Sequence, residues 1–309
     1  MPVCRIVAIF DPYMKHLPNL LTLANLFCGC LAIAYIMSAQ PYTSMSIDTG
    51  LPVWQWVYGA EEIYLGGILI GVAAIFDMLD GFAARALKVY SPIGKDLDSL
   101  ADIVSFGVAP SAIIFKLLWD TLMAEKNALD VSIIGMAPAF LIACFAALRL
   151  AKFNITSDKQ KAYFIGMPTP AAGLFIASFP LVMWFNPYNL ALLFMSDQYK
   201  GYAPAWVVGL CDVAATAQRF FKGCLQNKWF LYFIIAFVCW LMVSGVKFIK
   251  LIPAANGGKK GLSRFWPQLV LILATIVAIP FIQMAAIPFA FILYVLLSVI
   301  YQQPVEVMA

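Results

Sequence analysis

Residues 64–82 read YLGGILIGVAAIFDMLDGF, an apolar stretch that carries two acidic residues, Asp77 and Asp80, close to its end. About 20 apolar residues in an α-helix cross the ~30 Å hydrocarbon layer of a membrane. The apolar residues here are continuous rather than alternating with polar ones, which favours a helix over a barrel strand. This stretch therefore predicts a transmembrane helix with two carboxylates near its end.

The remainder of the chain has the same apolar character. Of its 309 residues, 63% are hydrophobic and 12% are charged, whereas a soluble domain is about half apolar and about a quarter charged. Backbone groups in lipid must form internal hydrogen bonds, so membrane-spanning chains are helical or form closed barrels. We predict an all-α polytopic transmembrane bundle in a single domain, residues 1–309. About eight spans are expected, at Leu20–Met37, Tyr64–Phe82, Ile103–Leu118, Ile133–Leu150, Thr169–Phe185, Phe230–Val246, Leu269–Gln283 and Ile287–Ile300.

The segment 186–228 interrupts this series of spans. It is too polar and too broken to cross the membrane, and its Trp206, Phe220 and Phe221 are typical of packing at a membrane surface. We interpret it as an insertion and assign it no function.

The positions of the Lys and Arg residues indicate an orientation. Most of the 20 basic residues fall in connections on one side of an eight-span arrangement, beginning with Arg5 and Lys15 before the first span. Cytoplasmic loops of membrane proteins are enriched in Lys and Arg. We therefore expect both termini, and the connection between the second and third spans, to be cytoplasmic.

That connection contains the candidate catalytic and metal-binding residues. Residues 76–102 read FDMLDGFAARALKVYSPIGKDLDSLAD. Asp77 and Asp80 are three residues apart and Asp98 and Asp102 four apart, so each pair shares one face of a helix. Carboxylates at membrane depth are costly without a compensating charge, and oxygen ligands without His or Cys nearby favour Mg²⁺ or Mn²⁺. A zinc site is not expected, because the chain has one histidine and no C-x-x-C pair.

The residues between the acidic pairs fit a diphosphate. Gly81 and Ala84 lie within one turn of Asp80, and Gly94 ends the connecting segment. Small side chains let a bulky ligand approach the backbone, and the Arg85 guanidinium suits phosphate oxygens. Divalent metal, small residues and a guanidinium together predict a diphosphate-binding site in the motif 77–102.

The pattern D-x-x-D-G-x-x-A-R, eight residues, G-x-x-x-D-x-x-x-D resembles the motif of the CDP-alcohol phosphotransferase family, and every fixed position is matched. The resemblance implies that Asp77, Asp80 and Asp98 hold two divalent metal ions against the diphosphate of a CDP-linked lipid. It implies that Asp102 is the general base and shares in metal binding. Residues Gly81 to Arg85, with Gly94, would line the CDP site.

Four further segments resemble the membrane-type phosphatidylserine synthases of bacteria and archaea: LPNLLT (17–22), LDSLADIVSFGVAP (97–110), LRLAKFN (148–154) and GMPTPAA (166–172). The likeness covers roughly residues 17–185, with Lys152 in place of an expected Arg and Thr169 in place of Ser. It implies transfer of a phosphatidyl group from CDP-diacylglycerol to L-serine, in phospholipid biosynthesis. Arg149, Lys152 and Asn154 are candidates to bind the serine carboxylate or a lipid phosphate, while Arg149 and Lys152 also fit membrane-surface anchors.

Two other functions fit part of this pattern. A same-family enzyme that uses glycerol 3-phosphate or an inositol phosphate would carry the same aspartates, but should need more phosphate-binding Arg than Arg149 and Lys152 supply. A polytopic transporter also places acids inside a bundle. It would not need the full motif spacing, and no inverted repeat is visible in the sequence.

The expected setting follows from these inferences. CDP-diacylglycerol, L-serine and membrane lipids are the expected partners, and nucleic acid is not. A homodimer is compatible with the sequence. We expect an integral protein of the bacterial or archaeal cell (inner) membrane, with its active site facing the cytoplasm.

Overall fold

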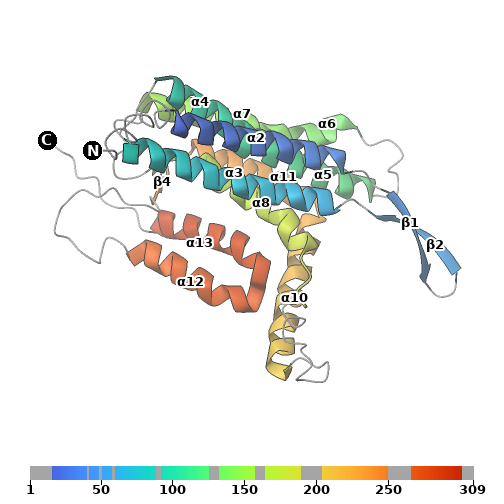
Figure 1. The fold of residues 1–309 in the computed structure, drawn as a ribbon. Helices are drawn as coiled ribbons and strands as arrows, with labels where there is room; N and C mark the ends of the chain where they lie inside the picture. Colours follow the sequence, from blue (N-terminus) through green and yellow to red (C-terminus); the bar gives the residue numbers. More distant parts are fainter. Residues whose placement is uncertain are drawn as a thin grey trace, which may run out of the picture.

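The computed structural model describes residues 16–39, 42–48, 51–57, 60–87, 92–124, 132–156, 164–188, 204–249 and 266–300. The expected N-terminal basic residues Arg5 and Lys15 lie outside these ranges. Within them the chain is built mainly of helices (Figure 1). The helices are α2 (Leu17–Ser38), α3 (Ala60–Leu87), α4 (Pro92–Asp102), η1 (Ile103–Val108), α5 (Ala109–Met123), α6 (Ile133–Met136), η2 (Ala137–Phe140), α7 (Leu141–Thr156), α8 (Thr169–Trp184), α10 (Ala205–Leu225), α11 (Lys228–Val243), α12 (Trp266–Ile282), η6 (Gln283–Ala285) and α13 (Ala286–Ile300).

The central bundle consists of α2, α3, α5, α7, α8 and α11, which run side by side (Figure 1). Two glycines on α3 allow its neighbours to come close. A Cβ at Gly66 would clash with Ile36 of α2, and one at Gly67 would lie 2.8 Å from the Ala177 carbonyl of α8. Small residues at such crossings let membrane helices pack tightly.

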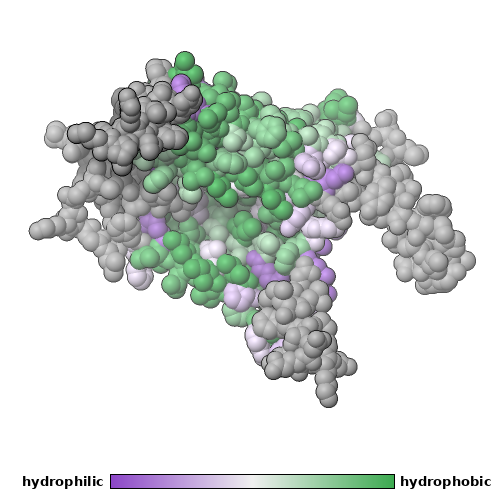
Figure 2. Space-filling model, in the orientation of Figure 1, coloured by the Kyte–Doolittle hydropathy of each residue, from purple (hydrophilic) through white to green (hydrophobic). Residues whose placement is uncertain are grey.

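The outer surface of the bundle is apolar, as Figure 2 shows for one face. Phe27 of α2 and Phe82 of α3 are 63% and 65% exposed. Side chains of this size are rarely exposed in such numbers on a soluble monomer. Lipid is the solvent that accounts for this surface, so the chain is an integral membrane protein.

The spans agree in kind with the sequence prediction. Among the described residues, five helical segments are long and apolar enough to cross a membrane, and the bent pair α10 and α11 provides a sixth. All eight predicted segments coincide with helices, but α8 has only 16 residues. The last two predicted spans form one run that turns at η6, where α12 and α13 pack against each other (Figure 1). The all-α membrane fold is thus confirmed, and the number eight remains a prediction.

Among the described residues, two pairs of short antiparallel strands accompany the helices. Strands β1 (Tyr42–Asp48) and β2 (Leu51–Val57) pair antiparallel between α2 and α3, at the end of the bundle where α6 also lies (Figure 1). Strands β3 (Phe164–Ile165) and β4 (Lys247–Phe248) pair antiparallel at the opposite end. Neither pair is predicted from the sequence. Strands β3 and β4 have two residues each, too few for a period-2 pattern, and the apolar runs that define the predicted spans do not include β1 and β2.

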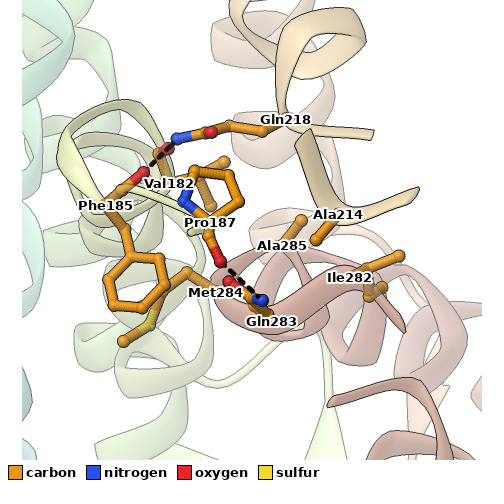
Figure 3. A pocket seen from close by; sticks show the side chains of 9 residues that line it. All are labelled: Val182, Phe185, Pro187, Ala214, Gln218, Ile282, Gln283, Met284 and Ala285. Atoms are coloured by element: carbon orange, nitrogen blue, oxygen red, sulfur yellow. Dashed lines mark hydrogen bonds between the residues drawn. The ribbon is translucent and has the colours of Figure 1, made fainter. Parts of the chain in front are cut away.

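In the described part of the predicted insertion, residues 186–188 and 204–228, the chain forms one long helix, α10. It is bent by 86° from α11, so it runs across the direction of the bundle (Figure 1). Gln218 of α10 donates hydrogen bonds to the carbonyls of Val182 and Phe185, which end α8, and Gln283 donates to the Pro187 carbonyl (Figure 3). These amides satisfy carbonyl groups that have no partner in a helix. The small pocket that they border lies among α8, α10 and η6.

One buried basic side chain also donates a hydrogen bond to a carbonyl at the end of a helix. Lys116 of α5 is buried, and its ammonium donates to the Ala39 carbonyl at the end of α2 over 2.7 Å. It lies 4.9 Å from the centre of the Trp119 ring. A cation at a helix C-terminus is favoured by the helix dipole, which gives this charge at membrane depth a structural role.

Candidate active site

Three carboxylates from two helices meet at one end of the bundle. Asp77 comes from α3, Asp98 and Asp102 come from α4, and one oxygen of each lies within 4.8 Å of the others. Asp102 is 7% exposed, and the other two are partly buried. Negative charges this close repel strongly in a medium of low dielectric constant. A donor set of oxygens alone, with excess negative charge, fits a hard divalent cation.

Helical spacing places these carboxylates. Asp98 and Asp102 are one turn apart on α4 and therefore point to the same side. Directly after Asp102 the chain becomes a π-helix, η1, in which the Ala109 amide donates to the Val104 carbonyl five residues earlier. Pro110, which lacks an N–H group, follows. Such π segments are frequent at functional sites because they change the direction of neighbouring side chains.

Asp80, the fourth predicted ligand, lies apart from the cluster of three. It is 6% exposed, and its Oδ2 accepts a hydrogen bond of 2.7 Å from the Thr22 hydroxyl of α2. It remains close enough to Asp77, Asp98 and Asp102 to repel them. All four predicted carboxylates are therefore at one end of the bundle. Three of them have oxygens within 4.8 Å of one another, and the fourth accepts a hydrogen bond from α2.

Asn25 is a residue that sequence reasoning missed. It is fully buried on α2, and its amide group donates to Asp102 Oδ1 at 3.5 Å. Its own carbonyl oxygen, Oδ1, has no hydrogen-bond partner among the described residues. The Ser105 hydroxyl of η1 donates to the Asn25 backbone carbonyl at 3.1 Å. The available signal was the i, i+3 spacing of Thr22 and Asn25, two polar residues on one face of an apolar helix.

The predicted diphosphate-binding residues border the same end. Gly81 and Ala84 are partly buried on the last turns of α3, and Arg85 is exposed there. A Cβ added at Gly81 would meet only the Arg85 guanidinium, at 3.5 Å. Gly94 is partly buried in the first turn of α4. The backbone of α3 next to Asp80 is thus open to a ligand, with a guanidinium beside it.

The three candidates for the acceptor are placed differently from one another. Arg149 of α7 is 7% exposed, close enough to Asp102 to attract it, and donates to the Thr169 hydroxyl at 3.4 Å. Lys152 is exposed on the surface of α7. The Asn154 amide donates to the Ser99 hydroxyl at 2.9 Å and so links α7 to α4. Arg149 is thus the candidate that lies buried beside Asp102.

An apolar helical bundle with clustered carboxylates at one end defines a membrane protein with an acidic site that could hold a divalent metal. The sequence model of CDP-alcohol phosphatidyltransferases matches residues 15–196, which include the whole cluster. This chain belongs to that family. Members of the family generally depend on a divalent metal, in agreement with the donor set described above.

Several individual proteins are similar to the chain. The CDP-diacylglycerol–serine O-phosphatidyltransferase of Bacillus subtilis (strain 168) is 34% identical over 179 residues, 58% of this chain and 82% of that protein. The protein of the same name from Helicobacter pylori (strain J99) is 34% identical over 160 residues, 52% of this chain and 54% of that protein. That from Methanocaldococcus jannaschii is 38% identical over 111 residues, 36% of this chain and 48% of that protein.

Proposed function

We propose that this protein transfers a phosphatidyl group from CDP-diacylglycerol to L-serine, giving phosphatidylserine and CMP for phospholipid biosynthesis. The observation that carries the proposal is the cluster of Asp77, Asp98 and Asp102 at one end of an apolar bundle. The names of the similar proteins support the choice of serine. Family membership speaks against the transporter alternative.

In the proposed site, Asp77, Asp80, Asp98 and Asp102 hold two divalent ions, Mg²⁺ or Mn²⁺. When bound, these ions would neutralise the diphosphate and the charge that develops on the departing CMP. Thr22 fixes Asp80 in one rotamer through its short hydrogen bond. Gly81, Ala84, Arg85 and Gly94 bind CDP, with the small residues admitting the nucleotide and Arg85 contacting phosphate oxygens.

Asp102 acts as the general base. It accepts the proton of the serine hydroxyl, whose oxygen forms a bond to the lipid-side phosphorus while the bond from that phosphorus to the CMP oxygen breaks. The Asn25 amide, which donates to Asp102, holds the carboxylate toward the substrate. A site at the end of the apolar bundle would let the acyl chains stay in lipid while serine enters from water.

Arg149 binds the serine carboxylate. A buried guanidinium near Asp102 is a suitable partner for a carboxylate that must be held next to the base. Lys152 and Asn154 have weaker support. Lys152 is exposed, where it can attract anionic substrates, and the Asn154 amide is engaged with Ser99.

For the whole chain we propose a single domain with eight spans, both termini in the cytoplasm, and the active site facing the cytoplasm of a bacterial or archaeal cell. Arg85, Lys95, Arg149 and Lys247 are on elements at the same end of the bundle as the acidic cluster (Figure 1). Positive residues concentrate on the cytoplasmic side, which supports this orientation.

An acceptor panel tests the proposal. Purified protein in lipid nanodiscs receives CDP-diacylglycerol with Mg²⁺ or Mn²⁺ and either L-serine, glycerol 3-phosphate, inositol or inositol phosphate, and CMP release is measured. We expect the highest kcat/KM with L-serine. Faster release with a phosphorylated acceptor contradicts the serine assignment and retains the transfer reaction. No CMP release with any alcohol contradicts both.

A further inference from the structure

Helix α13, the last helix among the described residues, reaches the active-site end of the bundle although it lies outside residues 15–196, which the family model matches. Tyr294 of α13 is 6% exposed and close enough to Arg149 for the two groups to interact electrostatically. Ser298, one turn further on, is fully buried. Both side chains contact the segment that follows β4.

The side chains of Tyr294 and Ser298 both form hydrogen bonds with the backbone of Ile249. The Tyr294 hydroxyl donates to the Ile249 carbonyl at 3.1 Å, and the Ile249 amide donates to the Ser298 hydroxyl at 3.4 Å. The Tyr294 ring also packs on Phe248, with 5.6 Å between ring centres. Residues four apart on a helix share one face, so α13 forms a clamp on the segment that follows β4.

The clamped segment in turn holds the chain that leads to Thr169. Strand β4 pairs with β3, and the Gly166 amide donates to the Val246 carbonyl at 2.9 Å. Gly166 has a φ of +76°, a conformation open mainly to glycine, and a Cβ there would clash with the Met242 carbonyl. The backbone from β3 to Thr169 is therefore held by hydrogen bonds and close contacts with α11 and the residues around β4.

Thr169 completes the path to the site, since it is fully buried and accepts the hydrogen bond from Arg149. We infer that Tyr294 and Ser298 position Arg149 for the acceptor by fixing β4, and through it β3 and Thr169. This inference rests on the proposed role of Arg149 in binding the acceptor carboxylate. It makes helix α13 part of the structure that selects the acceptor.

The test compares two tyrosines whose hydroxyls donate to different backbone carbonyls. Tyr294→Phe removes the hydroxyl and keeps the ring on Phe248. Tyr232→Phe is the matched control, because the Tyr232 hydroxyl also donates to a backbone carbonyl, that of Gly135, at 2.7 Å and at the opposite end of the bundle. Ser298→Ala gives a second, independent variant. For each protein the KM for serine, the KM for CDP-diacylglycerol, kcat and the thermal midpoint are measured.

We expect Tyr294→Phe and Ser298→Ala each to raise the KM for serine about two- to tenfold, as loss of one ordinary hydrogen bond predicts. The KM for CDP-diacylglycerol should stay unchanged, and Tyr232→Phe should leave the KM for serine unchanged. In an Arg149→Lys background Tyr294→Phe should add little, because residues that act as a unit have non-additive effects.

The proposed role of α13 and the proposed role of Arg149 can be refuted separately. If Arg149→Ala raises the KM for serine while both α13 variants leave it unchanged, the clamp is refuted and the role of Arg149 stands. If Arg149→Ala itself has no effect on that KM, the proposed acceptor site is wrong. If Tyr294→Phe and Tyr232→Phe lower the thermal midpoint and kcat alike, without a selective change in KM for serine, Tyr294 is merely structural and the inference is overturned.

Discussion

Asp77 and Asp98 belong to different helices, and each supplies an oxygen to the same acidic cluster. Replacement of either by Asn removes one charge from a site that a divalent cation has to balance. We expect Asp77→Asn and Asp98→Asn to abolish CMP release while the protein still inserts and elutes as a monodisperse species in size-exclusion chromatography. Activity that survives excess EDTA would falsify the metal-dependent mechanism.

Asp102 combines metal binding with proton transfer in the proposed mechanism. A positioned base contributes about 10²–10⁴-fold to a rate. Asp102→Asn is therefore expected to lower kcat by that order and to leave CDP-diacylglycerol binding nearly intact, measured as retention of a fluorescent CDP-lipid. A variant that keeps more than about a tenth of the wild-type kcat, on the same scale, excludes Asp102 as the base.

Replacement of Thr22 tests whether α2 orients Asp80 in the site. A hydrogen bond to a charged group contributes about 1.5–3 kcal/mol, so Thr22→Val, which keeps the shape, should weaken the orientation of Asp80. We expect a rise of about tenfold or more, from that range, in the Mg²⁺ concentration needed for half-maximal CMP release. Thr121→Val is the control, because the Thr121 hydroxyl donates to the Leu118 carbonyl of its own helix and not to an aspartate. Equal responses of the two variants would argue against a role for Thr22.

At the scale of elements, the site depends on how closely α2 packs on the π-helix η1. A Cβ at Gly29 would clash with the Ser105 hydroxyl and lie 2.9 Å from the Ser105 Cα, whereas a Cβ at Gly71 of α3 meets nothing within 4 Å. Gly29→Ala should cost about 1–3 kcal/mol through overpacking and displace η1, which follows Asp102. We expect a lower thermal midpoint and lower kcat for Gly29→Ala, and a midpoint equal to or above wild type for Gly71→Ala. Tolerance of Gly29→Ala would mean that η1 can shift without harm to the site.

At the scale of the whole molecule, the proposed orientation places the two ends of the bundle in different compartments. Lys95 is exposed on α4 beside the aspartates, and Gln226 is exposed between α10 and α11 at the other end. In a cysteine-free background, a membrane-impermeant maleimide applied to intact cells should label Gln226→Cys and spare Lys95→Cys. After cell lysis both should react. The reverse pattern in intact cells would invert the proposed topology.

The sequence by itself determined the membrane-helical class and indicated the acidic cluster. Long apolar runs specify helices because lipid offers the backbone no other partner, and α2, α3, α5, α7, α8 and α11 lie where these runs predict them. The spacing of Asp77, Asp80, Asp98 and Asp102 predicted the acidic site because helical periodicity alone puts each pair on one face. These are local properties, which a linear sequence contains.

Only the tertiary structure decided which other residues meet these aspartates. Thr22 and Asn25 reach Asp80 and Asp102 across more than 50 residues of chain, and the contact requires the close packing of α2 on its neighbours. Arg149, rather than Lys152, is directed inward by the way α7 packs against η1 and α11. Contacts between distant segments depend on helix packing and connection geometry, and a single sequence contains no periodic signal for either. For the same reason the series of contacts that links α13 to Thr169 is visible only in the folded molecule.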